Sequence, residues 1–290
     1  LILQTYVINI TFERFCMLLE QIVFECIDKI NFNSKPHIIG ITGSQGAGKS
    51  TLSANIRLNL LKQGINCLIV CIDDYYLSKS KRLKLAQDVH PLCAVRGVPG
   101  SHDIELLDKI LSMLTNPSSY SQILFPIFSK ADDDLKDISE WRVYTDKPDV
   151  IIFEGWCLGA RPNFLNLNYI NDLERNKDKD SKWKLWSIEN CKNYLKLWEY
   201  YDQLIMIKPE NFNSVIKSRW KQEKDTLRIS GKSLFKNYSH IIDFCSYYEN
   251  WTKGMWNNLE SEVDILLTRD DSYNYKFYNK KNNYTINERD

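Results

Sequence analysis

Apolar residues follow two alternating patterns along the chain. Short continuous apolar runs predict strands covered on both faces, as in a parallel sheet. Apolar residues repeated at helical spacing predict helices with one buried face. The strands are expected at 38–42, 67–72, 150–153, 204–207 and 263–268, and the helices at 11–30, 49–63, 103–114, 188–201, 211–228 and 233–256. This alternation predicts an α/β fold, with a mostly parallel sheet between two layers of helices.

Two polar stretches interrupt the alternation. Residues 166–184 are rich in Asn, Asp and Lys, and we expect a solvated, partly disordered insertion there. Residues 270–282 are rich in Asn, Tyr and Lys and predict a loop, followed by a short strand at 284–286. The pattern shows neither an internal repeat nor a second large core, so we expect one domain over residues 1–290.

Composition narrows the function classes. The net charge is +1, which does not favour nucleic acid or an anionic membrane as a partner. The 8 cysteines lack metal-site spacing, and the first residues, from Leu1 on, lack the basic start and cleavage site of a signal peptide. No apolar run approaches the roughly 20 residues that span a bilayer. We therefore expect a cytoplasmic protein, either a monomer or a weak homo-oligomer.

A phosphate-binding loop follows the first predicted strand. Its glycines let the backbone wrap round an anion, and the helix that begins behind it adds the positive end of its dipole. Its lysine can reach the β- and γ-phosphates, and its last hydroxyl can hold Mg²⁺. The loop consists of Gly43, Ser44, Gln45, Gly46, Ala47, Gly48, Lys49 and Ser50, and Thr51 follows it. A chance glycine-rich turn is the alternative, and the strand–loop–helix context argues against it.

Acidic residues stand at the carboxyl ends of two other predicted strands. Asp73 and Asp74 follow the run 67–72, and Glu154 follows the run 150–153. Ligands of open α/β sheets bind at this edge. Glu154 suits a metal-organising role together with Ser50, whereas Asp73 suits acceptance of a proton from an acceptor hydroxyl. Alternatively, Asp73 and Asp74 only form a turn or cap after the strand.

Five sequence blocks resemble the D-glycerate 3-kinase family, including its fungal ATP-binding kinase-like relatives. That family lies within the wider group of phosphoribulokinase, uridine kinase and pantothenate kinase. Besides the phosphate loop, the blocks are Ile72-Asp-Asp-Tyr-Tyr-Leu77, Arg96-Gly-Val-Pro-Gly-Ser-His-Asp103, Pro126-Ile-Phe-Ser-Lys130 with the acids 132–134, and Phe153-Glu-Gly-Trp-Cys-Leu-Gly159. The resemblance implies a three-layer P-loop NTPase fold and an ATP- and Mg²⁺-dependent kinase that acts on a hydroxyl of a small acceptor, with D-glycerate as the leading candidate.

The resemblance also implies roles for individual residues. Asp73 falls on the position of the catalytic base, and Asp74 then has a supporting or metal-binding role. The acceptor side is implied at Arg96, His102, Asp103 and Lys130. Asp103 has an alternative as a helix cap, and Lys130 as a surface lysine.

A lid is expected over about 210–256, with Arg219 reaching the nucleotide phosphates. The alternative for both Arg219 and Arg228 is a solvated position on the helix surface. Nine residues apart on one helix, the two arginines would project on roughly opposite faces.

Two other functions remain open at this stage. One is a kinase for uridine, pantothenate or a sugar phosphate. The other is a non-catalytic, nucleotide-binding regulator. A guanine-reading motif is suggested only by residues 176–180, which lie in the polar insertion rather than at a strand end. The sequence leaves the acceptor and the preference for ATP over GTP undecided.

Overall fold

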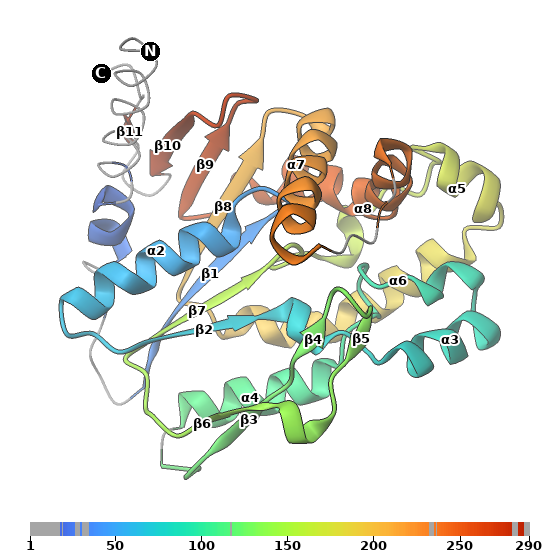
Figure 1. Cartoon of the computed structure of the whole chain (residues 1–290). Coiled ribbons are helices and arrows are strands. Elements are labelled where there is room, and N and C mark those ends of the chain that lie inside the picture. Colours follow the sequence, from blue (N-terminus) through green and yellow to red (C-terminus); the bar gives the residue numbers. More distant parts are fainter. Residues whose placement is uncertain are drawn as a thin grey trace.

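A computed structural model describes residues 18, 20–26, 30, 35–116, 118–231, 235, 237–279 and 284–286. Residues 20–26 are helical, and most of the rest of the helix expected over 11–30 lies outside the described residues. Figure 1 shows a central sheet with helices packed on both of its faces. The predicted fold class is therefore confirmed.

Within the described residues, the central sheet has seven strands in the order β11-β10-β9-β8-β1-β7-β2. The strands are β1 (His37–Gly43), β2 (Cys67–Cys71), β7 (Val150–Gly155), β8 (Gln203–Pro209), β9 (Ile265–Arg269), β10 (Tyr275–Asn279) and β11 (Tyr284–Ile286). The five neighbouring strands β2, β7, β1, β8 and β9 pair in parallel. β10 and β11 extend this sheet with antiparallel pairing. β1 lies between β7 and β8, so the loop that follows β1 emerges near the middle of the sheet.

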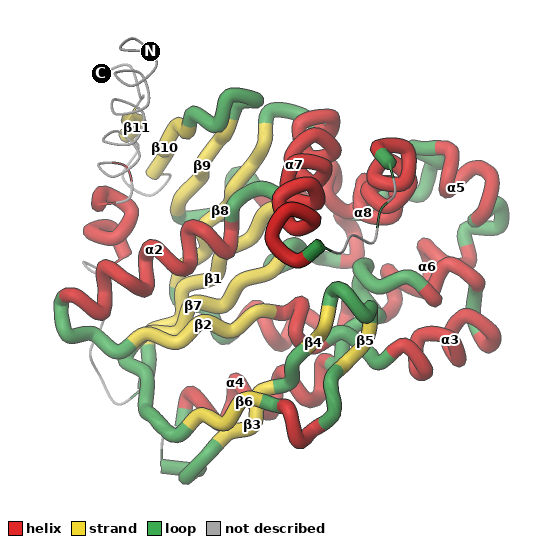
Figure 2. Tube along the Cα trace, in the orientation of Figure 1, coloured by secondary structure: helices red, strands yellow, loops and turns green. Residues whose placement is uncertain are grey.

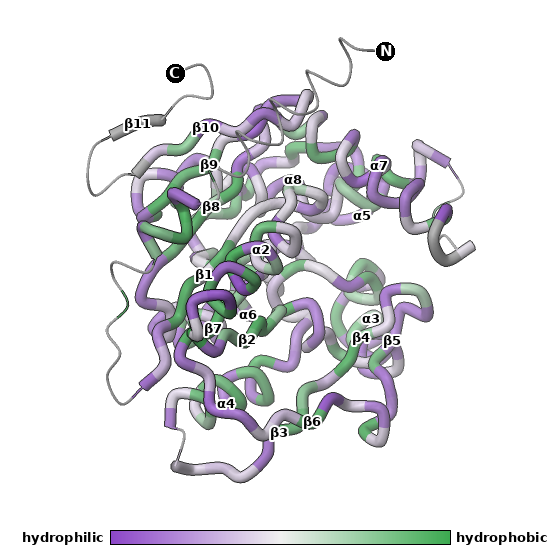
Figure 3. Tube along the Cα trace, turned by 60° about the vertical axis from the view of Figure 1, so that its left-hand side comes forward, coloured by the Kyte–Doolittle hydropathy of each residue, from purple (hydrophilic) through white to green (hydrophobic). Residues whose placement is uncertain are grey.

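Helices cover the sheet because its apolar side chains alternate between two faces. In β7, Val150 and Ile152 belong to one buried cluster, whereas Ile151 and Phe153 belong to the other. The first cluster packs under α2 and the second under α4 and α8. The helices are α2 (Lys49–Lys62), α3 (Lys79–Asp88), α4 (Ile104–Thr115), α5 (Asp172–Lys177), α6 (Lys182–Cys191), α7 (Phe212–Ser230) and α8 (Tyr238–Leu259). In Figure 3 hydrophobic colour concentrates on the central strands, while α7 is mostly hydrophilic.

Short elements carry the connections. Figure 2 shows two small antiparallel pairs outside the main sheet, beyond its β2 edge. They are β3 (Ile123–Phe125) with β6 (Arg142–Tyr144), and β4 (Phe128–Ser129) with β5 (Asp134–Leu135). The 3-10 turns are η1 (Ile72–Tyr75), η2 (Pro91–Ala94), η3 (Ile138–Glu140), η4 (Pro162–Phe164) and η5 (Lys192–Glu199). The helix expected over 188–201 is thus divided between α6 and η5.

The prediction of a solvated, partly disordered insertion over 166–184 is wrong in part, because most of its residues are exposed but the stretch is folded and buries some of its charges. α5 and the start of α6 lie in this stretch, and Glu174 and Lys184 are each only 1% exposed. Lys184 Nζ lies 3.3 Å from Glu174 Oε2 and also donates to the carbonyl of Leu167. Asn250 of α8 donates to the other Glu174 oxygen. Two charges of this stretch, Glu174 and Lys184, therefore satisfy each other inside the protein.

The prediction of a loop over 270–282 is also wrong in part, because β10 occupies Tyr275–Asn279 and pairs with β9. Phe277 is fully buried in the cluster under α2, and this burial holds the strand against the sheet. No helix in the described ranges has the length and apolar composition that crossing a membrane requires.

Candidate functional site

The phosphate loop joins β1 to α2 at the carboxyl edge of the sheet, as the sequence predicts. Gly46 and Gly48 have φ values of +70° and +102°, which L side chains rarely adopt. A Cβ at Gly46 would also lie 2.9 Å from the Ser218 carbonyl carbon in α7. Glycine at position 46 therefore allows both the turn of the loop and the close approach of α7.

Lys49 reaches back across the loop from the first turn of α2. Its Nζ donates to the carbonyl oxygens of Gly43 at 2.8 Å and Ser44 at 3.1 Å. Burial lowers the pKa of Lys49, while the nearby charges of Glu154 and Asp73 act in the opposite direction. The ammonium therefore lies between the loop and two carboxylates, a position suited to a multiply charged anion.

Ser50 and Glu154 meet beside the loop. The Ser50 hydroxyl donates to both carboxylate oxygens of Glu154, at 2.9 and 3.3 Å. Glu154 is 4% exposed and lies in β7, where it is in register with Ile41 of β1. A hydroxyl and a carboxylate at this distance are oxygen ligands of the kind that Mg²⁺ prefers. These two residues therefore fit the metal-binding role that the sequence predicts for them.

Asp73 lies in η1, directly after β2, and pairs with Lys130 from the turn between β4 and β5. Lys130 Nζ donates to Asp73 Oδ2 at 2.8 Å. Burial alone would raise the pKa of Asp73, but the charges of Lys130 and Lys49 outweigh it and lower the pKa. Asp73 in turn raises the pKa of Lys130. The other Asp73 oxygen, Oδ1, is buried and has no hydrogen-bond partner within the described structure.

Asp74 differs from its neighbour because it forms no ion pair within the described part of the chain, although the charges of Lys130 and Arg142 act to lower its pKa. Burial and the adjacent Asp73 charge raise the pKa of Asp74 to about 6. A hydrogen bond from the backbone of Phe128 acts in the opposite direction. Two consecutive carboxylates thus have pKa values shifted in opposite directions, with Asp73 kept ionised and Asp74 about half protonated near pH 6.

His102 lies beside Asp73, and its imidazole is enclosed by aromatic rings. It stacks on Tyr76 with the ring centroids 4.2 Å apart, and its Nδ1 lies 2.8 Å from the Tyr194 hydroxyl. That hydroxyl accepts from the Gly100 N–H, which favours donation of its own proton to Nδ1 and places the imidazole proton on Nε2. Burial lowers the pKa of His102 to about 4, and Nε2 is an unpartnered buried atom. The ring therefore offers one unused neutral N–H donor.

Asp103 takes the capping alternative that the sequence left open. Its Oδ1 accepts from the Leu106 N–H at the start of α4, and its Oδ2 lies 3.6 Å from Lys81 Nζ. Of the adjacent residues His102 and Asp103, only His102 has a buried polar atom without a hydrogen-bond partner in the described structure.

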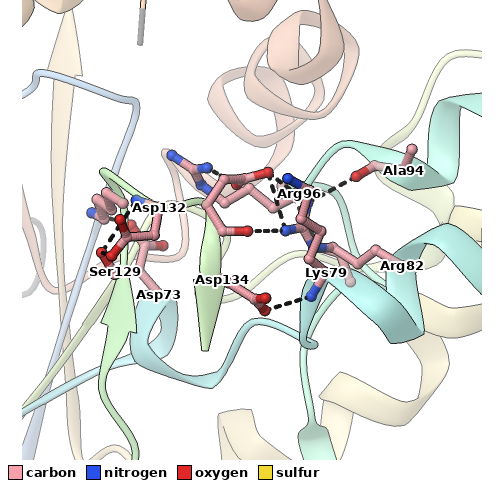
Figure 4. A network of polar contacts seen from close by, with 12 residues as sticks. Asp73, Lys79, Arg82, Ala94, Arg96, Ser129, Asp132 and Asp134 are labelled. Atoms are coloured by element: carbon pink, nitrogen blue, oxygen red, sulfur yellow. Dashed lines mark hydrogen bonds and ion pairs between the residues drawn. The ribbon is translucent and has the colours of Figure 1, made fainter. Parts of the chain in front are cut away.

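Arg96 is held in an ion-pair network that Figure 4 shows from close by. Its guanidinium pairs with Asp133, which also pairs with Arg82, and it lies 5.4 Å from the centre of the Phe128 ring. Arg82 is fully buried and donates to the carbonyls of Leu77 and Ala94. One carboxylate thus balances two buried guanidiniums in this network.

The turn that carries Asp133 is tied down on several sides. Lys130 pairs with Asp73, and Asp134 accepts from the Lys79 N–H at the start of α3. Asp133 has φ +54°, in the left-handed region. We name residues 129–134 the acceptor turn, because it connects the proposed base Asp73 with the predicted acceptor residue Arg96.

A cleft of about 970 Å³ opens on the same arginine. It is bounded by α5, α8 and the segment 94–96, and Arg96 and Asp133 are among the residues that line it. No residue of the phosphate loop lines this cleft. The cleft therefore approaches the site from the Arg96 side.

The Arg219 guanidinium does not contact the phosphate loop in this structure. It pairs with Glu223 at 2.8 Å and lies over the rings of Phe235 and Phe244. Only the backbone of α7 at position 219 approaches Gly46. Arg228 is exposed and lies 3.5 Å from Asp225, as the helix-surface alternative predicts.

Two side chains of the phosphate loop have buried polar atoms that are available for a ligand. The Ser44 hydroxyl and the Gln45 side-chain oxygen are buried without a hydrogen-bond partner in the described structure, whereas Thr51 is exposed. Buried polar atoms without partners are costly unless a ligand satisfies them. Ser44, Gln45, Asp73 and His102 each carry such an atom.

Sequence reasoning did not identify Arg269 and Asp133. Arg269 ends β9 and donates to the phosphate-loop carbonyls of Gly46 and Ala47. A charged residue directly after an apolar strand at the same sheet edge was the available signal for it. Asp133 belongs to the acids 132–134 of a resemblance block, but nothing in the local pattern indicates that it would face Arg96.

Comparisons with known proteins show which proteins the chain is similar to in sequence and fold. No protein-family model matches the chain. An uncharacterized kinase of Schizosaccharomyces pombe is 26% identical over 74% of this chain and 79% of its own length. The chloroplastic D-glycerate 3-kinase of Arabidopsis thaliana is 26% identical over 73% of this chain, and the match spans 46% of that longer protein. Uridine and pantothenate kinases are among the further sequence relatives.

Solved structures give the same picture of the fold. The D-glycerate 3-kinase of Cryptococcus neoformans superposes with a TM-score of 0.65 at 22% identity, covering 93% of this chain and 96% of that one. The relatives in sequence and fold are thus P-loop kinases of the group that the sequence resemblance indicates. At these identities, the comparisons support a kinase of this group and leave its acceptor undetermined.

Proposed function

We propose that the protein transfers the γ-phosphoryl group of ATP to a hydroxyl of a small acceptor, with D-glycerate as the first candidate. One observation carries the proposal. Asp73 is an ionised carboxylate with an unused oxygen, and it lies close enough to Lys49 for their charges to act on each other. A proton acceptor near a phosphate-binding lysine is the arrangement that phosphoryl transfer to a hydroxyl requires.

The nucleotide half of the reaction is assigned to the phosphate loop. Its backbone N–H groups and Lys49 would hold the triphosphate, with Ser44 and Gln45 offering further polar atoms. Ser50 and Glu154 would hold Mg²⁺, which neutralises phosphate charge when bound. These groups act by positioning and by electrostatics, which supply most of the acceleration in phosphoryl transfer.

Asp73 is assigned to the acceptor hydroxyl. Its low pKa keeps it ionised, so it can accept the hydroxyl hydrogen bond and aim the oxygen at the γ-phosphorus. The same low pKa makes it a weak base while Lys130 stays paired with it. Movement of Lys130 toward substrate or phosphate charge would remove part of this effect and make Asp73 more basic.

The acceptor side offers groups that complement an anionic, hydroxylated molecule. Arg96 can pair with a carboxylate, and the Nε2 atom of His102 can donate to an acceptor oxygen. Lys130 can balance additional negative charge near the transferred group. These groups fit a small hydroxy acid, and the D-glycerate 3-kinases among the relatives support that class.

The test is release of ADP by the purified protein with ATP, Mg²⁺ and one acceptor at a time. The panel contains D-glycerate, L-glycerate, uridine, pantothenate and ribulose 5-phosphate, with an acceptor-free control. We expect D-glycerate to stimulate ADP release most strongly. Stimulation by another acceptor alone would reassign the substrate, and hydrolysis that no acceptor changes would support a regulator instead.

A further inference from the structure

We propose that Arg269 is a positioning residue for the nucleotide, which orients the phosphate loop and joins it to α7. Arg269 is the last residue of β9 and is 3% exposed. The inference rests on the proposed function in one respect, that a nucleotide binds to residues 43–50. Arg269 itself would not contact the nucleotide, because its contacts lie behind the loop.

The guanidinium of Arg269 divides its hydrogen bonds between two elements. Its Nη1 donates to the carbonyl of Gly46 at 3.0 Å and, more weakly, to that of Ala47 at 3.4 Å. Its Nη2 donates to the Ser218 hydroxyl of α7 at 2.6 Å. A planar guanidinium can hold two such acceptors in one fixed geometry, which a lysine ammonium cannot reproduce.

Bonding of these carbonyls determines where the next N–H groups point. A trans peptide carries its C=O and its following N–H on opposite sides of the chain. When Arg269 draws the carbonyls of Gly46 and Ala47 toward itself, the N–H groups of Ala47 and Gly48 point away from it. The Ala47 N–H donates to the Ser44 carbonyl at 3.2 Å, which closes a turn within the loop, and Lys49 donates to the same carbonyl. Arg269 therefore fixes the planes of these two peptides within the phosphate loop.

The same residue fixes the position of α7 against the loop. The α7 backbone at residues 218 and 219 lies at contact distance from Gly46, so a shift of the helix would press on the loop. Nearby, Ser214 and Lys217 of α7 both bond to Asp271, two residues beyond Arg269. The turn after β9 thus holds the first half of α7 along one side of the phosphate loop.

Two tyrosines after Arg269 support this arrangement. The Arg269 guanidinium lies 4.5 Å from the centre of the Tyr273 ring. The Tyr275 hydroxyl is 3.1 Å from the place where a Cβ at Gly48 would stand. The phosphate loop is therefore backed at Gly46 by Arg269 and at Gly48 by Tyr275.

The experiment measures ATP binding separately from turnover. Isothermal titration with ATP and Mg²⁺ gives the Kd of the wild type and of Arg269→Lys, Arg269→Gln and Ser218→Ala. We expect Arg269→Lys to raise the ATP Kd about tenfold or more, because the fork to Gly46 and Ser218 is lost. Ser218→Ala keeps the loop bonds and should change it by less than about threefold. Arg161→Lys, which alters an exposed pair with Glu262, should leave the Kd unchanged.

The kinetic readout separates positioning from a merely structural role. In the acceptor-stimulated reaction, Arg269→Lys should raise the KM for ATP in parallel with the Kd and leave the KM for the acceptor unchanged. A lower unfolding temperature with an unchanged ATP Kd would overturn the inference, and so would equal increases in both KM values. If Arg269→Lys does not fold, the ATP Kd of Arg269→Gln decides, because its amide can donate to at most one of the two elements and a Kd equal to the wild type would contradict the proposal. Failure of the wild type itself to bind ATP would overturn the proposed function.

Discussion

The candidate site has two sides that are built differently. The phosphate-loop side consists mainly of the backbone of consecutive residues, whereas the acceptor side consists of side chains from segments far apart in the chain. Residues 43–50 form one turn, and Lys49 bonds to carbonyls of the same turn. On the other side, Asp73 pairs with Lys130, 57 residues away, and Arg96 with Asp133, 37 residues away. Each predicted acceptor-side charge therefore already has an oppositely charged partner in the protein.

This difference explains how the two sides meet their ligands. A backbone cradle presents donors whose geometry the fold already sets, so a phosphate gains contacts at little reorganisation cost. An anionic acceptor must instead compete with Asp133 for Arg96, and its hydroxyl must share Asp73 with Lys130. Nucleotide binding should therefore tolerate changes in the acceptor turn 129–134, while acceptor selection should depend on them.

The largest expected effect is at Lys49, on the phosphate-loop side. Lys49→Ala removes the ammonium that lies between the loop and the two carboxylates, and turnover should fall at least about 100-fold. The far-ultraviolet circular dichroism spectrum and unfolding temperature should stay close to those of the wild type. Lys62→Ala, at the exposed end of the same helix, is the matched control. Retained activity in Lys49→Ala would reject the phosphate site.

The next effect is at Asp73, where the two sides meet. Asp73→Asn keeps the shape of the side chain but removes its negative charge, so kcat should fall about 100-fold or more if it is the general base. The Kd for ATP, measured by titration, should change much less. The exposed Asp88→Asn serves as the control. An unchanged kcat would transfer the role to Asp74 or to another group.

A smaller and more selective effect is expected at Arg96. Arg96→Met leaves Asp133 paired with Arg82 and removes the proposed partner of the acceptor anion. The KM for the acceptor should rise about tenfold or more, while the KM for ATP stays within a factor of about two. Arg96→Lys keeps the charge, so its KM for the acceptor should lie between those of the wild type and Arg96→Met. This intermediate value guards against a folding defect in the methionine variant. Equal changes in both KM values would contradict the separation of the two sides.

The smallest expected effect concerns Asp74, which should change how the stability of the fold depends on pH. Because burial and Asp73 raise its folded pKa from 3.8 to about 6, the folded protein binds this proton more tightly than the unfolded chain. The stability associated with the proton is present below the unfolded pKa and is lost as the pH rises through about 6. Asp74→Asn removes this loss, so its unfolding temperature should exceed that of the wild type at pH 7, and the difference should shrink toward pH 4. A difference that does not depend on pH would contradict the raised pKa.

The sequence predicted the parts of the fold that depend on local pattern. The apolar runs identified the five parallel strands, and the glycine spacing identified the phosphate loop and the helix behind it. The positions of Asp73 and Glu154 after such runs placed both at the right sheet edge. These features depend on neighbours in the chain, which a single sequence shows directly.

The missed features depend on residues that are far apart in the chain. The pair of Glu174 and Lys184 is buried because Asn250 and a backbone carbonyl complete its hydrogen bonds, and no local pattern indicates those partners. β10 was missed although its residues Tyr275, Lys276 and Phe277 alternate as a half-buried strand does. The contact of Arg269 with Gly46 joins residues 223 positions apart, so it could not be inferred without the strand order.

The contact between Arg269 and the phosphate loop also has a consequence for the order of folding during synthesis. Residues 43–50 leave the ribosome long before residues 269–275, and their backing from Arg269 and Tyr275 forms only when β9 and β10 join the sheet. Pairings so distant in the chain are slow to form, because a large loop must close first. A nascent chain halted before β9 would therefore carry the complete glycine motif without the framework that shapes it.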